Sequence, residues 1–258
     1  MMANEFAFTL ELNEKVSRDK EDEIRRARML EDIKSQRMDI TIGMREQDEY
    51  KLGNPVPSRQ ARNILIVTHG RSGSSFIGEM LSQYPGIFYS YEPLHFERDT
   101  LSLENKIERI KQVFKCEPPE SLIQEDWPKA LNSNFRFHDA CEQYGIKSCK
   151  VPEVYKSACQ IFPIHLIKTI RLPFEEANTI LMDPEIGNKL KIIFLLRDPR
   201  GVHQSVESIV NWCNECNVSN LCKRLKSDVK AALDLKKQYP GSRFRLRLIN
   251  PPNLLQKI

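Results

Sequence analysis

The chain has 258 residues, of which 40% are hydrophobic and 29% charged, and its net charge at pH 7 is +4. This length can bury one sizeable α/β core, and the composition is typical of a soluble globular protein. The small positive excess suits an acidic cofactor or an acidic glycan and gives no indication of nucleic-acid binding.

The first 60 residues differ from the rest of the chain. Residues 13–45 are dense in charged side chains with scattered Leu, Ile and Met, which predicts a solvated helix or a partly disordered arm. Residues 53–58 are rich in Gly and Pro and indicate a linker. We therefore expect a charged arm and linker over 1–60 and one domain over 61–258.

The most informative stretch follows, from Asn63 to Phe76. The apolar run 64–67 predicts a buried parallel strand, residues 70–75 form a loop of Gly, Ser and one Arg, and apolar residues then recur at helical spacing over 76–81. A strand, a small-residue loop and a helix can hold a phosphate, because glycines let backbone N–H groups converge and the helix start adds positive dipole charge. The stretch predicts a phosphate-binding loop.

Alternating strands and helices continue to the end of the chain. Residues 117–162 give weaker signals, typical of short helices. Asp198-Pro199 is a strong helix start, with Asp at the N-cap and Pro at the first helical position. Continuous apolar strands between helices predict an α/β fold with a P-loop-like parallel sheet and helices on both faces. The expected strands cover 87–91, 164–170, 190–196 and 243–249, and the expected helices cover 102–116, 174–182, 199–210 and 221–238.

The composition of the loop argues against a phosphate-loop NTPase or kinase. In those proteins the second glycine is followed by a lysine for the phosphates and by a Ser or Thr for magnesium. Here Ser74 follows Gly73, and none of the expected strands ends in an obvious acidic magnesium ligand. The loop is also too short for the dinucleotide fingerprint. We expect a phosphate site without a bound metal, with Arg71 as the fixed positive charge.

A second anion site is expected at another strand end. Arg197 directly follows the buried strand 190–196, and Ser205 lies on the helix after it. Ligands of open α/β sheets bind at the carboxyl ends of the strands, where an arginine and a serine suit a second phosphate group. Two phosphate sites on two strand ends, without a metal, fit a 3′,5′-bisphosphate nucleotide.

These motifs resemble the sulfotransferase superfamily, and in particular the Golgi carbohydrate 6-O-sulfotransferases that modify Gal, GalNAc or GlcNAc. The resemblance covers about 62–245 and includes the segments 71–76, 91–93, 167–172 and 197–205. It implies a sulfotransferase fold, 3′-phosphoadenosine 5′-phosphosulfate (PAPS) as the sulfuryl donor without a metal, and a glycan acceptor on a glycoprotein or proteoglycan. It also implies residence in the Golgi lumen or membrane.

The resemblance assigns the anion-binding residues. Arg197 and Ser205 are expected to bind the 3′-phosphate. Arg200 is expected to be exposed on the first turn of its helix, outside the site. Arg71 also takes a catalytic role, because it faces the leaving phosphate. The residues expected to bind the 5′-phosphosulfate are those of the loop, Arg71, Ser72, Gly73, Ser74, Ser75 and Phe76.

The sequence offers several candidates for the residue that accepts the hydroxyl proton. Glu92 follows the second strand, where a carboxyl group can face the sulfate, and the resemblance also points to it as the catalytic base. The alternative is that Glu92 is a structural cap or salt-bridge carboxylate, with His69 and His95 as the next candidates for the base. Lys168 and Arg171 are candidates to meet an acidic glycan or the cofactor, or to be paired structurally.

The chain also departs from the family pattern. The family's membrane anchor is missing, no apolar stretch is long enough to span a membrane or to act as a secretion signal, and a complete chain of this kind would be cytoplasmic. The segment 239–246 resembles the family sequence that leads into an RYEDL element, but residues 247–258 differ and end the chain. We therefore expect a truncated or divergent member, with an inactive or binding-only relative as the alternative.

Seven cysteines are present, so at least one has no intramolecular partner. Cys213, Cys216 and Cys222 lie close together in the sequence, but a structural zinc site takes four ligands and no matching pair stands elsewhere. We expect buried thiols or a lumenal disulfide at this cluster rather than a metal.

Overall fold

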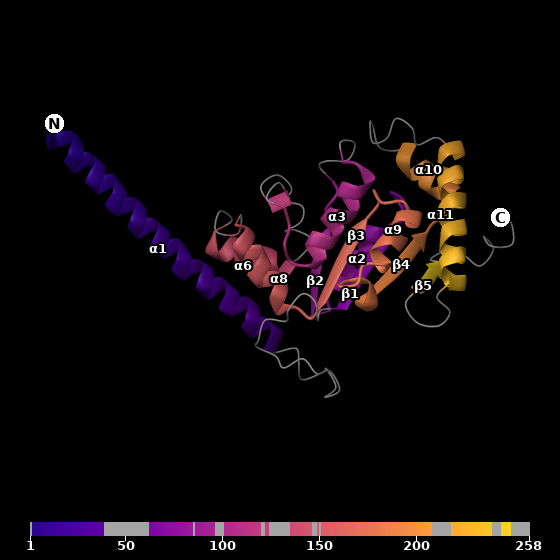
Figure 1. Ribbon diagram of the computed structural model, residues 1–258, viewed down its shortest axis with the longest axis horizontal. Coiled ribbons are helices and arrows are strands. Elements are labelled where there is room, and N and C mark those ends of the chain that lie inside the picture. The colour runs from indigo at the N-terminus through magenta and orange to yellow at the C-terminus, as the bar shows by residue number, and fades with distance from the viewer. Residues whose placement is uncertain are drawn as a thin grey trace.

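A computed structural model describes residues 2–38, 62–84, 86–95, 101–119, 122–123, 135–145, 149, 151–207, 218–238 and 244–248. Its centre is one five-stranded sheet in the order β2-β3-β1-β4-β5, and every neighbouring pair is parallel. The expected parallel α/β fold is therefore confirmed (Figure 1). The strands are β1 (Arg62–Thr68), β2 (Ile87–Tyr91), β3 (Ile164–Thr169), β4 (Leu190–Leu196) and β5 (Phe244–Leu248).

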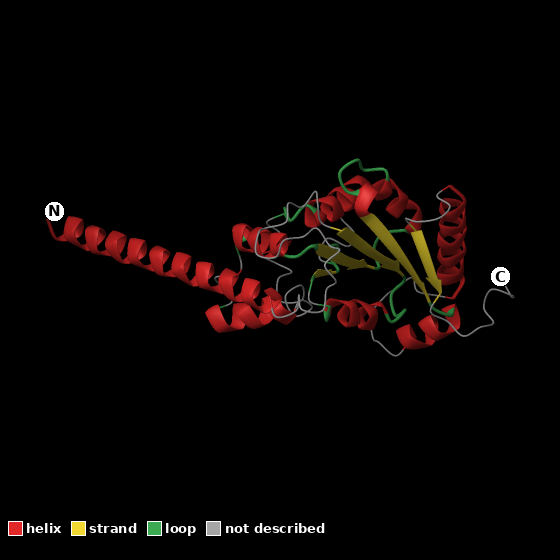
Figure 2. Cartoon of the chain, turned by 90° about the horizontal axis from the view of Figure 1, so that it is seen from below, coloured by secondary structure: helices red, strands yellow, loops and turns green. Residues whose placement is uncertain are grey.

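Helices cover both faces of the sheet, as predicted (Figure 2). The helices of the sheet domain are α2 (Ser74–Ser82), α3 (Leu103–Phe114), α9 (Phe174–Leu181), α10 (Pro199–Glu207) and α11 (Val218–Gln238). A short 3₁₀ turn, η3 (Gly187–Lys189), precedes β4. Because successive side chains of a strand point to opposite faces, Leu65 and Val67 pack in the cluster with α3, α9 and α11, whereas Ile66 packs on the α2 side.

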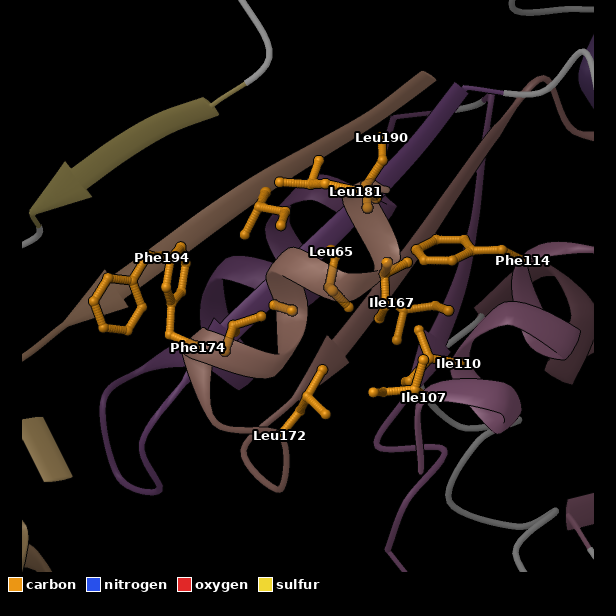
Figure 3. Close-up of a cluster of buried hydrophobic side chains, with 14 of the residues drawn as sticks. Leu65, Ile107, Ile110, Phe114, Ile167, Leu172, Phe174, Leu181, Leu190 and Phe194 are labelled. Carbon is orange, nitrogen blue, oxygen red and sulfur yellow. The ribbon is translucent and has the colours of Figure 1, made fainter. Parts of the chain in front are cut away.

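The larger core cluster lies between the sheet and the helices α3, α9 and α11. Phe174 at the start of α9 packs on Phe194 of β4, with ring centroids 4.5 Å apart. Leu65 lies at the centre of this cluster (Figure 3). Its fully buried side chains fix the strand ends from which the site residues project.

A second cluster joins α6 (Phe135–Tyr144) and α8 (Pro152–Ile161), the short helices expected between 117 and 162, to α1 (Met2–Met38). The amino-terminal part of α1 projects away from the domain (Figure 1), and Val16 and Ile24 are exposed there. Met29 and Ile33, by contrast, are fully buried against α6 and α8. The expectation of a solvated arm therefore needs correction, because this end of α1 is part of the packed structure. None of the described helices is long and apolar enough to cross a membrane.

Two disulfides are present in the part of the chain that the structure describes. Cys116 at the end of α3 is bonded to Cys159 of α8, and Cys141 of α6 is bonded to Cys149. Cys222 is exposed and unpaired among the described residues. The other two cysteines of the predicted cluster, at 213 and 216, lie outside the described residues.

Candidate anion-binding site

A cavity of about 280 Å³ lies at the carboxyl ends of β1, β2, β3 and β4. This is the edge at which parallel α/β sheets bind their ligands. Four cationic side chains and one carboxylate border it, so its walls carry a positive excess. The lining residues are Gly70, Arg71, Gly73, Ser74, Ser75, Tyr91, Glu92, His95, Lys168, Ile170, Arg171 and Arg197.

The loop after β1 has the backbone that an anion cradle requires. Gly73 has φ +85° and forms the N-cap of α2 without a side-chain cap, so the first N–H groups of the helix have no capping side chain. Arg71 also has positive φ, 63°, which a non-glycine residue rarely adopts and which often accompanies a functional site. The buried Ser72 hydroxyl has no hydrogen-bond partner among the described residues. The loop is thus rich in polar groups that a ligand could satisfy.

The two predicted phosphate-binding groups come together in space. The Arg71 Nε donates a hydrogen bond to Ser205 Oγ at 2.9 Å, and Arg197 Nη1 donates to the Arg71 carbonyl oxygen at 2.8 Å. Gly201 permits this approach, because a Cβ on it would lie 3.3 Å from Arg197 Nε. Arg197 therefore reaches the loop after β1, and Arg71 of that loop reaches α10, although these segments are more than 120 residues apart in the sequence.

Glu92, which also lines the cavity, is the centre of a buried ion cluster. Its Oε1 lies 2.5 Å from Lys168 Nζ, and its Oε2 lies 2.6 Å from Arg171 Nη1. Glu92 is only 2% exposed, has φ +46°, and accepts a further, longer bond from the Ile170 N–H at 3.4 Å. Lys168 Nζ also lies over the Tyr91 ring, 4.6 Å from its centroid. Both cations that were candidates for a ligand are therefore paired with the candidate base.

The similarity of the chain to known proteins agrees with this geometry. No family model matches the chain. Over 191 residues it is 28% identical to mouse "Carbohydrate sulfotransferase 5", covering 61% of this chain and 48% of that protein. Over 213 residues it is 26% identical to mouse "Carbohydrate sulfotransferase 4", covering 71% and 54%. The chain is thus similar to carbohydrate sulfotransferases over part of their length.

Human "Carbohydrate sulfotransferase 6" is 25% identical to the chain over 191 residues, covering 61% of the chain and 48% of the relative. The chain spans about half the length of the curated relatives it matches. Among solved structures, the sulfotransferase domain of the Synechococcus PCC 7002 olefin synthase aligns at 16% identity and a TM-score of 0.38, over 79% of this chain and 69% of that one. The sulfotransferase domain from the curacin biosynthetic pathway aligns at 18% identity and a TM-score of 0.40, over 76% and 68%.

The remaining predicted residues differ in their position relative to the cavity. Phe76 is 68% exposed on α2 and, like Ser72 and Ser205, is not a lining residue. His95 lines the cavity, whereas His69 is buried beside it. The two histidines that were alternatives for the base therefore differ in their access to a ligand, and His95 has the better access.

The helix start at Asp198 is confirmed. Its Oδ1 accepts a hydrogen bond from the Arg200 N–H at 2.9 Å, and its carboxylate pairs with the exposed Arg200 side chain. Hydrogen bonds from that guanidinium hold the pKa of the Asp198 carboxyl below its usual value. Arg200 thus faces its own cap, while Arg197, three residues earlier, faces the cavity.

Asp228 is a buried charged residue near the site that the sequence reasoning missed. It lies on α11 among the buried residues Leu225, Ala232 and Leu235, and its Oδ2 is 3.1 Å from His69 Nε2. A carboxylate at helical spacing within an apolar stripe was the available signal, because charged side chains are seldom fully buried without a partner.

Cys116, Cys159 and His165 bring three potential metal ligands within 4.8 Å of one another. The two sulfur atoms are joined in a disulfide, which leaves no thiolate for a metal. Burial lowers the pKa of His165, and its ring nitrogens lie 3.0 Å and 3.1 Å from the carbonyl oxygens of Phe114 and Cys159. This cluster therefore has a structural character and lies apart from the residues that line the cavity.

Proposed function

We propose that the protein transfers a sulfuryl group from PAPS to a hydroxyl group, the 6-hydroxyl, of a Gal, GalNAc or GlcNAc residue in a glycan. The observation that carries the proposal is that Arg197 contacts the small-residue loop that contains Arg71, and that both arginines line one cavity at the carboxyl ends of the strands. The sequence relationship to carbohydrate sulfotransferases supports the same reaction class.

The charge of the cavity fits the donor. PAPS carries a 5′-phosphosulfate and a 3′-phosphate, and guanidinium groups bind such anions through paired hydrogen bonds. We assign the 5′ group to Arg71, the loop 72–75 and the uncapped start of α2, and the 3′-phosphate to Arg197 with Ser205. The contact between Arg71 and Ser205 links the two subsites, so binding at one positions the side chains of the other.

In this reaction the protein positions the donor and the acceptor and stabilises the charge that develops. The acceptor oxygen bonds to sulfur while the bond from sulfur to the phosphate oxygen breaks, and the hydroxyl proton leaves to a base. Arg71 and the N–H groups of the loop stabilise the negative charge that develops on the leaving phosphate. Glu92 borders the cavity and is the proposed base, because its Oε1 retains a lone pair beyond the bond that it accepts from Lys168.

A binding-only relative is the second candidate. The observation in its favour is that both Glu92 oxygens already accept hydrogen bonds from Lys168 and Arg171, so the carboxylate also has a structural partner on each oxygen. Such a protein would keep the nucleotide contacts and lack transfer.

Residence in an oxidising compartment such as the Golgi lumen is part of the proposal. Disulfides form and persist in such compartments and are rare in the cytosol, and the described residues contain two. The proposed acceptor, a glycan on a glycoprotein or proteoglycan, is found in the same compartment.

The test is transfer of labelled sulfate from PAPS to acceptors that end in Gal, GalNAc or GlcNAc. Arg197→Ala should lose transfer, while the matched variant Arg200→Ala, three residues away and facing Asp198, should keep it. Transfer of labelled sulfate to acceptors in which the 6-hydroxyl is blocked would contradict the proposed 6-O position. Nucleotide binding without transfer to any acceptor would favour the binding-only relative.

A further inference from the structure

Two loops contribute residues to the lining of the cavity. The first loop, residues 69–73, follows β1 and leads into α2, and the second loop, residues 170–173, follows β3 and leads into α9. Both contact α11, which begins far later in the sequence than the second loop. We propose that Asp228 of α11 is a positioning residue that, together with Arg224, fixes these two loops relative to each other and so sets the geometry of the anion site.

The contact with the first loop is made through His69. The Nε2 atom of its buried imidazole lies 3.1 Å from Asp228 Oδ2, and both side chains are less than a tenth exposed. His69 is followed directly by Gly70 and Arg71, which line the cavity. A displacement of the imidazole therefore moves the backbone that carries the Arg71 guanidinium.

The contact with the second loop uses the other oxygen of the same carboxylate. Asp228 Oδ1 accepts a hydrogen bond from the Phe174 N–H at 2.9 Å, at the start of α9. The N-cap of α9 is Pro173, which offers no capping side chain, so a residue of another helix supplies the acceptor. One turn earlier on α11, Arg224 Nη2 donates to the Ile170 carbonyl oxygen at 3.1 Å.

The burial of Asp228 argues for a role beyond packing. A buried carboxylate is costly to desolvate, and the arginine nitrogen beside it, Arg224 Nε, is 3.9 Å away on a side chain that is 43% exposed. An apolar residue would complete the stripe of α11 without this cost. The carboxylate instead stands where it can bind both loops at once, and sub-ångström placement of charged groups strongly affects transfer reactions.

Hydrogen exchange measured by mass spectrometry on the ligand-free chain tests the inference directly. The compared proteins are the wild type, Asp228→Asn and Asp234→Asn, a matched change on the exposed face of the same helix, where Asp234 pairs with Lys237. In Asp228→Asn, exchange should rise about tenfold in peptides covering both loops and the helix starts behind them, residues 66–77 and 168–177. The control should match the wild type.

Three results would overturn the proposal: no change, a change in only one loop, or an equal rise throughout the sheet. If Asp228→Asn does not fold, Arg224→Ala replaces it as the test, because the Arg224 side chain is half-exposed. Arg224→Ala should raise exchange at 168–177 and leave exchange in α3 unchanged. Unchanged exchange at 168–177 would refute the bridge.

A second readout rests on the proposed function. Asp228→Asn should weaken binding of adenosine 3′,5′-bisphosphate about tenfold, with Asp234→Asn unchanged. Equal affinity in Asp228→Asn and the wild type would contradict the positioning role. Absence of nucleotide binding by the wild type would instead refute the proposed function, and the exchange experiment would still decide the role of Asp228.

Discussion

Replacing Glu92 with glutamine removes the negative charge at the centre of the buried ion cluster while keeping the shape of the side chain. In the wild type the carboxylate lies 2.5 Å from Lys168 Nζ and 2.6 Å from Arg171 Nη1. The amide in its place would offer one oxygen and no charge. Lys168, which is 3% exposed, would then keep a buried positive charge without its counter-ion.

The size of the effect follows from this burial. Breaking a buried ion pair by removing one partner costs about 3–5 kcal/mol, because the remaining charge is uncompensated. The Tyr91 ring lies beside Lys168 Nζ in both proteins, so its contact with the ammonium group does not change this difference. We expect Glu92→Gln to lower the free energy of unfolding by about 3 kcal/mol.

The assay is urea unfolding followed by circular dichroism, since guanidinium chloride would screen the charges. The control is Glu185→Gln, because Glu185 pairs with Lys115 at 2.7 Å on the exposed surface, and such pairs contribute about 0–1 kcal/mol. Adding Lys168→Met to Glu92→Gln should restore part of the stability, since it removes the uncompensated charge. A loss no larger than that of the control, or a double variant less stable than Glu92→Gln, would refute the reasoning.

Three further predictions concern the scaffold. Gly78→Ala should destabilise by about 1–3 kcal/mol in thermal unfolding, because its Cβ would lie 2.1 Å from the buried Tyr89 hydroxyl; an unchanged Tm would contradict this packing. Burial opposes ionisation of Asp183, but hydrogen bonds from Lys111 and the backbone lower the pKa of its carboxyl overall. This stability is present above the unfolded pKa of about 3.9 and is lost as pH falls through the folded value. Asp183→Asn should therefore lose most stability at neutral pH and least in acid; a loss independent of pH would count against it. Cys159→Ser removes the disulfide between Cys116 and Cys159, which are 43 residues apart in the sequence. It should lower the free energy of unfolding in urea by about 4 kcal/mol. A change below about 1 kcal/mol would show that other contacts hold the loop.

Much of the sheet was predictable because its signals are local. The expected strands over 87–91 and 190–196 agree with β2 and β4 at both ends. The loop after β1 and the cap at Asp198 follow from residue types that only certain backbone positions favour. The conformations of these segments depend on neighbours within a few residues, and a single sequence contains that information.

The composition of the cavity depends on contacts that no local pattern records. Strand β3 lies between β2 and β1, and this order places Lys168 and Arg171 against Glu92. The contact of Asp228 with His69 joins segments that are far apart in the sequence. The burial of one end of α1 was missed for a different reason, because its few apolar residues stand in a run dominated by charges, which is typical of a solvated helix.

Calorimetric titration of adenosine 3′,5′-bisphosphate, with EDTA and then with magnesium, tests the central claim most directly. The account predicts binding that does not require magnesium, and a loss of about 1.5–3 kcal/mol in each of Arg71→Ala and Arg197→Ala but not in Arg200→Ala. Binding that requires magnesium and prefers ATP, or equal affinity in all three variants and the wild type, would contradict it.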